Sequence, residues 1–79
     1  MTEKYNGWTT YETYNIALWI ENDEGLYNLA REYRHKGYEK FRELLRELEI
    51  IETPDKVSYN DSGLDIEELD NMMEELWQQ

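Results

Sequence analysis

Few side chains in this 79-residue sequence have the types and spacing that chemistry requires. Glu32 and His35 show the Glu-x-x-His spacing of di-iron helical bundles, but such a site needs two of these pairs, and the chain has only one histidine. The sequence has no cysteine, which excludes disulfides, thiolate metal sites and cysteine nucleophiles. We therefore expect His35 to be a solvated residue in the cationic last turn of a helix.

Two further patterns resemble sites less closely. Residues 58–69 place Gly63 where a calcium loop needs its central glycine, but Leu69 stands where the closing glutamate belongs. Glu67, Asp70 and Glu74 share a helical face, yet paired carboxylates work as acid and base only where burial separates their pKa values. We expect no catalytic residue, no metal ligand and no cofactor, and we predict that the chain is not an enzyme.

The formal net charge of −11 is distributed unevenly along the chain. Residues 31–46 carry six bases against three acids, whereas residues 47–79 carry eleven acids against Lys56 alone. Such an acidic surface repels nucleic acid and lipid head groups and attracts basic protein surfaces at long range. The sequence therefore predicts a protein partner or a second copy of the chain, and no direct binding of nucleic acid.

The chain shows neither a membrane span nor a signal peptide. Its longest apolar run, from Ile16 to Ile20, is far too short to cross a bilayer, and its polar first residues lack the basic-then-apolar pattern of a secretory signal. We expect a cytoplasmic protein that does not bind membranes.

Apolar periodicity and capping signals predict an all-α fold, a small single domain of four helices with a loop before the last one. The predicted helices cover residues 10–22, 24–36, 38–50 and 66–77. A short extended piece is a further option at residues 56–59, inside a loop that contains the only proline.

Several residues are expected to begin or end these helices. Thr9 with Glu12, and Asp65 with Glu68, have the spacing of capping boxes. Asp23 is the expected N-cap of the second helix, and Gly37 is the expected left-handed residue that ends it. The third helix has one apolar face, made by Tyr38, Phe41, Leu44, Leu45, Leu48 and Ile51.

The first helix is apolar around most of its circumference. Tyr11, Tyr14 and Leu18 occupy one side, and Ile16, Trp19 and Ile20 occupy much of the rest. Because three other helices could hardly enclose it in so small a protein, we predict that part of it, or the nearby region of Trp8 and Trp77, lies in a homodimer or partner interface. The alternative is that it is the central helix of a compact four-helix core.

The segment from residue 6 to residue 27, NGWTTYETYNIALWIENDEGLY, resembles the N-terminal signature of a family of small uncharacterised proteins of bacteriophages, cyanobacteria and plasmids. That signature reads close to NGWTNYETW followed by an LWLxNDEGLY-like stretch. Thr10 and Tyr14 depart from it, since Asn and Trp are commoner there, and a weaker similarity continues from Glu52 to the final helix. The positions that match include Asn6, Gly7, Trp8, Thr9, Tyr11, Glu12, Leu18, Trp19, Asn22, Asp23, Glu24 and Gly25.

The resemblance implies a phage or mobile-element context, with a marine source as one option, and the accessory proteins of such genomes often bind host proteins. The leading hypothesis is therefore a phage-type accessory protein that occludes a host protein through the acidic surface of residues 65–79 and an aromatic edge. The candidate interaction residues are Trp8, Ile16, Trp19, Ile20, Glu67, Asp70, Glu74 and Trp77.

Three alternatives stay open. The chain could be a structural or regulatory homodimer without a host target, in which the acidic surface serves only solubility. It could mimic nucleic acid, with the carboxylates of Glu67, Asp70, Glu74 and Glu75 in place of phosphates, although the basic stretch 31–46 interrupts the negative surface. The third alternative is a metal-dependent enzyme assembled across subunits.

Overall fold

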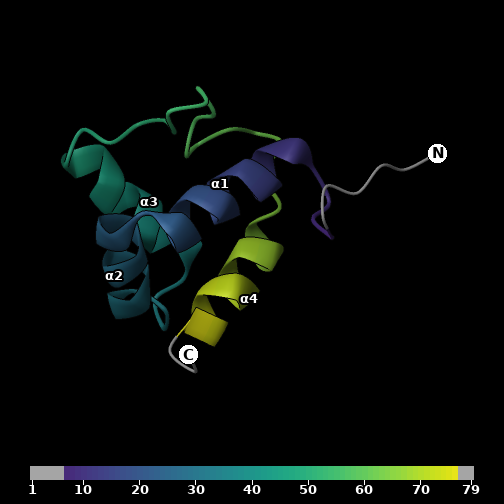
Figure 1. The fold of residues 1–79 in the computed structure, drawn as a ribbon. Helices are drawn as coiled ribbons and strands as arrows, with labels where there is room; N and C mark the ends of the chain where they lie inside the picture. Colours follow the sequence, from purple (N-terminus) through teal and green to yellow (C-terminus); the bar gives the residue numbers. More distant parts are fainter. Residues whose placement is uncertain (1–6, 77–79) are drawn as a thin grey trace.

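The computed structural model describes residues 7–76, which form four helices joined by short turns and one long loop (Figure 1). α1 spans Tyr11–Asn22, α2 spans Glu24–Glu32, α3 spans Tyr38–Glu47 and α4 spans Ile66–Leu76. Within residues 7–76 there is no strand, and the extended piece expected at residues 56–59 is reduced to a single antiparallel bridge between Glu52 and Ser58. The prediction of an all-α fold is confirmed.

α1 packs against α2 and α4, while α4 contacts all three of the other helices. Its side chains Ile16, Ala17 and Ile20 are at most 1 % exposed and lie in one core with residues from every other helix. The expectation that the chain cannot cover Ile16 and Ile20 is therefore wrong, since both are enclosed by their own chain. The enclosure of α1 is incomplete, since Trp19 is only partly buried and Tyr11 is 40 % exposed.

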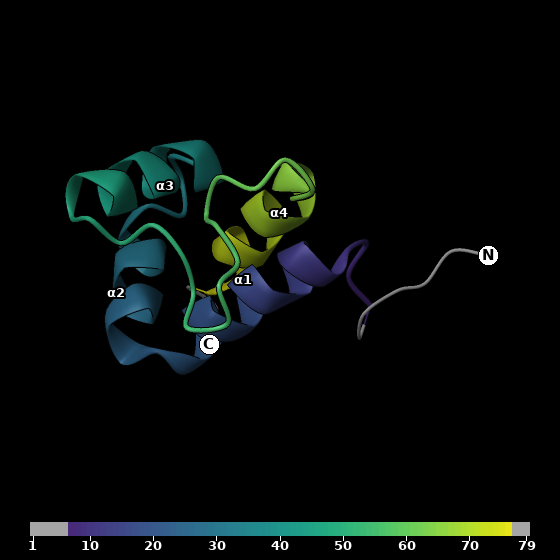
Figure 2. The ribbon, with the colours of Figure 1, turned by 90° about the horizontal axis from the view of Figure 1, so that it is seen from above.

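The loop between α3 and α4, in addition to the other helices, covers part of α1. Figure 2 shows this segment running from the end of α3 across α1 to the start of α4. Its residues Thr53, Val57 and Tyr59 are buried. The Tyr38 hydroxyl donates a buried hydrogen bond of 2.7 Å to the Tyr59 carbonyl, which attaches the loop to α3. A loop thus contributes part of the core.

The loop is folded into a tight hairpin. The amide of Lys56 donates to the Thr53 carbonyl at 2.8 Å, and the amide of Thr53 donates to the Val57 carbonyl at 2.9 Å. Lys56 has φ 72°, the left-handed residue that follows the turn in a three-residue hairpin connection. The Thr53 hydroxyl accepts the amides of Asp55 and Val57, both at 3.2 Å, so one side chain organises the whole turn. We call residues 51–59 the hairpin.

The helix N-termini are capped partly as expected. Asp23 caps α2 by accepting the Leu26 amide at 3.0 Å, as predicted. The N-cap of α1 is Thr10 rather than Thr9, with the Thr13 amide donating to the Thr10 hydroxyl at 3.1 Å.

The first turn of α4 departs from a capping box. Asp65 accepts the Glu68 amide at 3.1 Å, so it does cap the helix. The Glu68 carboxylate does not accept a hydrogen bond from the Asp65 amide, as a capping box would require. It accepts the Thr9 amide at 3.0 Å, while the Asp65 amide donates to the Thr13 hydroxyl at 2.8 Å. The predicted reciprocal pair is replaced by two bonds between α4 and the start of α1.

α2 and α3 are both shorter than predicted. α2 ends at Glu32, and turns at residues 33–36 lead to Gly37. Gly37 has the expected positive φ, 92°, but it does not end α2, whose C-cap is Tyr33. Gly37 is also the N-cap of α3 and has no side chain with which to cap it. Asp70 of α4 takes that role from a distance, since its Oδ1 accepts the Tyr38 amide at 2.6 Å.

α3 ends at Glu47 because the chain turns into a Schellman motif. The Ile50 amide donates to the Leu45 carbonyl at 2.8 Å, the Glu49 amide donates to the Arg46 carbonyl at 3.0 Å, and Glu49 has φ 65°. The predicted apolar face therefore stops at Leu45, and Leu48 and Ile51 are 51 % and 58 % exposed.

Replacing Glu49 with glycine should stabilise the protein. Glycine adopts a positive φ without the Cβ penalty, so Glu49→Gly is expected to raise the free energy of unfolding by about 1 kcal/mol. Urea denaturation measures the change. Glu49→Ala removes the same charge but keeps a Cβ, and it should gain less than the glycine variant. Equal stabilities would show that the left-handed conformation carries no cost here.

Substitution of Thr53, in contrast to that of Glu49, should destabilise the protein. Thr53→Val keeps the shape but leaves the Asp55 and Val57 amides and the Asn15 side chain without their buried partner, at an expected cost of about 1–3 kcal/mol. Thr53→Ser keeps the hydroxyl and loses one methyl group, at an expected cost of about 0.8 kcal/mol. Thermal unfolding of both variants tests the ranking, and a serine variant as unstable as the valine variant would contradict it.

Candidate protein-binding groove

An apolar groove lies where α1, α2 and the hairpin meet. Its volume is about 430 Å³, and it is lined by Trp19, Asp23, Gly25, Leu26, Leu29, Ile50, Glu52, Pro54 and Tyr59. We call it the Trp19 groove. Trp19, Leu29 and Ile50 are only partly buried, so the groove presents apolar side chains to solvent. A concave, mostly apolar lining with few polar groups is typical of a binding site.

The Trp19 ring is held in place by the polar side chains around it. Its Nε1 donates to Asp55 Oδ2 at 3.0 Å, and Asn15 Nδ2 donates to the same oxygen at 2.8 Å. Asn15 Oδ1 in turn accepts the Thr53 hydroxyl at 2.7 Å in a buried bond. An indole anchored in this way loses little conformational entropy when a partner packs against it, which makes Trp19 a suitable contact residue.

The electrostatics of the groove are negative. Hydrogen bonds from Asn15 and then from Trp19 lower the pKa of Asp55, which keeps that carboxylate charged at neutral pH. Burial, and after it the charge of Asp23, raises the pKa of Tyr59 to about 12, so the phenol stays neutral. Asp23 and Glu52 lie on the rim, and no lysine, arginine or histidine is among the described residues that line the groove.

A second hollow, of about 350 Å³, contains Trp8. It is lined by Gly7, Trp8, Glu21, Glu68, Asn71, Met72 and Glu75. Trp8 packs partly buried against the core. Trp8 and Trp19 therefore line different hollows, and the single aromatic edge expected from the sequence is two separate sites in the structure.

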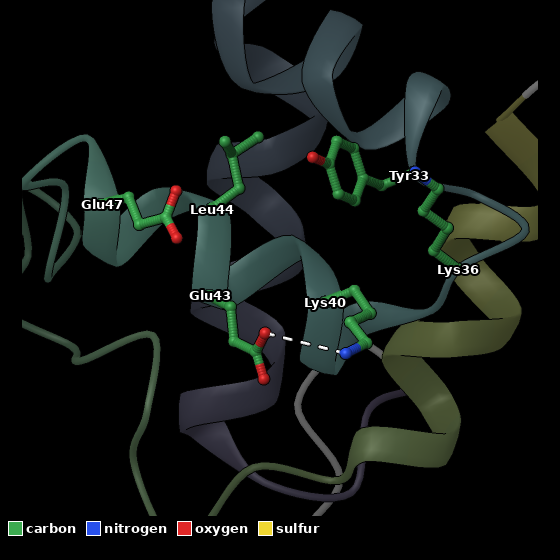
Figure 3. A pocket seen from close by; sticks show the side chains of 6 residues that line it. All are labelled: Tyr33, Lys36, Lys40, Glu43, Leu44 and Glu47. Atoms are coloured by element: carbon green, nitrogen blue, oxygen red, sulfur yellow. Dashed lines mark ion pairs between the residues drawn. The ribbon is translucent and has the colours of Figure 1, made fainter.

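A third hollow, of about 500 Å³, lies between the end of α2 and α3 (Figure 3). Lys36 Nζ lies 5.0 Å from the centre of the Tyr33 ring, and Lys40 pairs with Glu43 at 3.9 Å. Figure 3 shows the two lysines at one side and the carboxylates of Glu43 and Glu47 along α3. Because its charges are of both signs and its ion pair is solvent-exposed, this hollow offers no strong preference for a ligand.

The structure brings only part of the predicted interaction set to the surface. Ile16 and Ile20 lie in the core and cannot touch a partner, whereas Trp19 lines the apolar groove. Glu67 and Glu74 are exposed on α4. The remaining members are Trp8, which lines the second hollow, Asp70, which caps α3, and Trp77, which lies outside the described residues.

Of the nine residues that line the groove, only Trp19 belongs to the set predicted from the sequence. Leu29, Ile50 and Pro54 line it beside Trp19. Leu29 lies at the edge of the apolar stripe of α2, a position that often faces a neighbouring surface. Ile50 and Pro54 had no such signal, since their place depends on how the loop folds back onto α1.

The described residues show neither the ligand cluster of a metal site nor the features of a membrane-spanning helix. Within residues 7–76, no three or more histidine or carboxylate side chains gather in a way that could hold a metal ion. In the same range, no helix combines the length and the apolar character that crossing a membrane requires.

The hydrogen bonds of Asp55 predict how the stability of the protein changes at acidic pH. Because the folded pKa of Asp55 lies below its ordinary value, its contribution to stability is present above pH of about 4 and is lost as the pH falls through the folded pKa. Asp55→Asn keeps an acceptor for Asn15 and Trp19 but cannot titrate. We expect the stability advantage of the wild type over this variant to shrink between pH 6 and pH 2, roughly, as measured by thermal melts. A constant difference would contradict the assignment.

Comparison with known proteins places the whole chain in one family. Neither the curated proteins nor the solved structures include one similar enough to match it. The profile of a family of unknown function, DUF7249, matches residues 1–79. The chain therefore belongs to the DUF7249 family.

Proposed function

We propose that this protein is a small interaction domain that binds a partner protein by accepting an apolar side chain in the Trp19 groove. The observation that carries the proposal is Trp19 itself, half-buried at the edge of an apolar groove and oriented by a hydrogen bond to Asp55. No catalytic role is part of the proposal, because the groove contains no nucleophile paired with a base.

The dimensions and the rigidity of the groove support this role. A volume of about 430 Å³ falls within the range of ligand pockets and accommodates one or two bulky side chains. One wall belongs to α2 and the other to the hairpin, which is fastened to α1 by the bonds of Asn15. A preformed groove of this kind binds without the cost of ordering a loop.

The biological setting that we propose is that of an accessory protein of a phage or a related mobile element, acting in the cytoplasm of the host. Its support is the resemblance of residues 6–27 to proteins of phages, cyanobacteria and plasmids. The net charge of −11 and the exposed carboxylates of Glu67 and Glu74 fit long-range attraction to a basic host protein. Because Ile16 and Ile20 are buried, any homodimer would have to use the partly exposed Trp19 and not these two residues.

A display selection tests the proposal. Peptides would be selected from a random library on the wild-type protein, and their affinities would be measured by calorimetry for two variants. Leu29→Glu places a charge in the groove and should weaken binding at least about tenfold, which corresponds to 1.4 kcal/mol.

Leu44→Glu is the matched control. It makes the same change at a half-buried helical leucine that lines the hollow of Figure 3 instead. It should leave peptide binding unchanged. Circular dichroism would first establish that both variants are folded. Peptides that bind all three proteins equally, or a selection that enriches none, would refute the role of the groove.

A further inference from the structure

The charge pattern around the Trp19 groove points to the chemistry of its occupant. Resting on the function proposed above, we infer that the groove recognises a cationic segment of a partner protein, in which a bulky apolar side chain is flanked by lysine or arginine. The apolar side chain enters the groove, and the flanking cations lie against the carboxylates of Asp23 and Glu52.

The two rim carboxylates come from different parts of the fold. Asp23 joins α1 to α2, and Glu52 belongs to the hairpin. Both line the groove. A segment that crosses the groove between these two elements therefore meets negative charge from both. This placement favours basic residues on both sides of the apolar anchor.

Little within the groove neutralises these carboxylates. Asp23 accepts the neutral amide of Leu26, which leaves its charge in place, and that charge also acts on Tyr59 in the groove. Lys56 approaches Glu52 at 3.9 Å, but its side chain is 82 % exposed, and an exposed pair of this kind is readily exchanged for another cation. The ionised carboxylate of Asp55, bonded to Trp19, adds negative charge beside the apolar lining.

Arg42 lies 5.7 Å from the centre of the Tyr38 ring, and Arg46 donates to Asn60 at 3.2 Å. Four more basic residues line hollows elsewhere. Lys36 and Lys40 line the hollow of Figure 3, and Arg31 and Arg34 line a hollow with Asn28 and Glu32. None of these four lines the Trp19 groove. An acidic segment would thus meet only like charge there, a neutral one would gain apolar contact alone, and a cationic one would gain both.

Three capped heptapeptides test the inference. Each has leucine, phenylalanine and leucine at its centre and differs only at its flanks, which are lysine, glutamine or glutamate. NMR titration of the isotopically labelled protein reports both the affinity and the place of binding. At low salt the lysine peptide should bind about tenfold more tightly than the glutamine peptide, and the glutamate peptide should bind least. About 0.5 M salt should largely remove the difference, because it shortens the screening length to a few ångströms.

Charge-neutral variants assign the preference to the rim. The double variant Asp23→Asn with Glu52→Gln should bring the lysine peptide to within about twofold of the glutamine peptide, leaving the latter unchanged. Asparagine at position 23 still caps α2, so the helix is retained. The matched control, Glu67→Gln with Glu74→Gln, removes two charges from the exposed side of α4, away from the groove, and should preserve the preference for lysine.

The outcomes separate this inference from the proposed function. If the glutamine peptide binds in the groove as tightly as the lysine peptide at low salt, the inference is wrong, while the groove remains a binding site. The inference is also wrong if the preference survives in the rim variant or disappears in the α4 control. If no peptide shifts the signals of Trp19 and its neighbours, both the inference and the proposed function fail.

Discussion

The buried hydrogen bond between Thr53 and Asn15 is the constraint on which the rest of the structure depends. The Thr53 hydroxyl donates to Asn15 and accepts two amides of the hairpin, so it stabilises the turn and fastens it to α1 at the same time. Because both side chains are almost wholly buried, loss of either partner would leave a polar group without water. The hairpin in turn completes the cover of α1 and builds one wall of the Trp19 groove.

A second set of bonds fixes the other end of the same loop. The Thr10 hydroxyl donates to the Gly63 carbonyl at 2.9 Å, and since it has only one proton, the Thr13 hydroxyl must be the donor in the 2.8 Å bond between them. Thr13 then accepts the Asp65 amide. Small polar side chains of α1 therefore bind the loop at both of its ends, and the apolar ones fill the space below it. The same hydrogen bonds between α1 and the loop therefore stabilise the fold and shape the groove.

This arrangement also separates the charges of the protein. The Trp19 groove is lined by carboxylates without a base, whereas four basic side chains of residues 31–40 line hollows elsewhere on α2 and α3. A strongly acidic chain thus keeps a negative, apolar groove on one part of its surface and a mixed-charge surface on another. The charges around an apolar binding site mainly determine which partners are rejected, because a partner of like charge is repelled. The proposal of a selective binding site rests on this division of charge.

The sequence by itself determined the all-α fold, four helices close to their observed places, and the caps Asp23 and Asp65. These features follow from interactions within a few residues, where periodicity and capping chemistry act. Tertiary structure decided the rest. Whether Ile16 and Ile20 were core or interface depended on a loop folding back over α1 from nearly forty residues away, through Thr53 and Asn15, which are 38 positions apart. Asp70 likewise acts on α3 only because α4 packs beside it. The groove exists where residues 19–29 and residues 50–59 meet, and no local pattern encodes a contact between segments so far apart in the sequence.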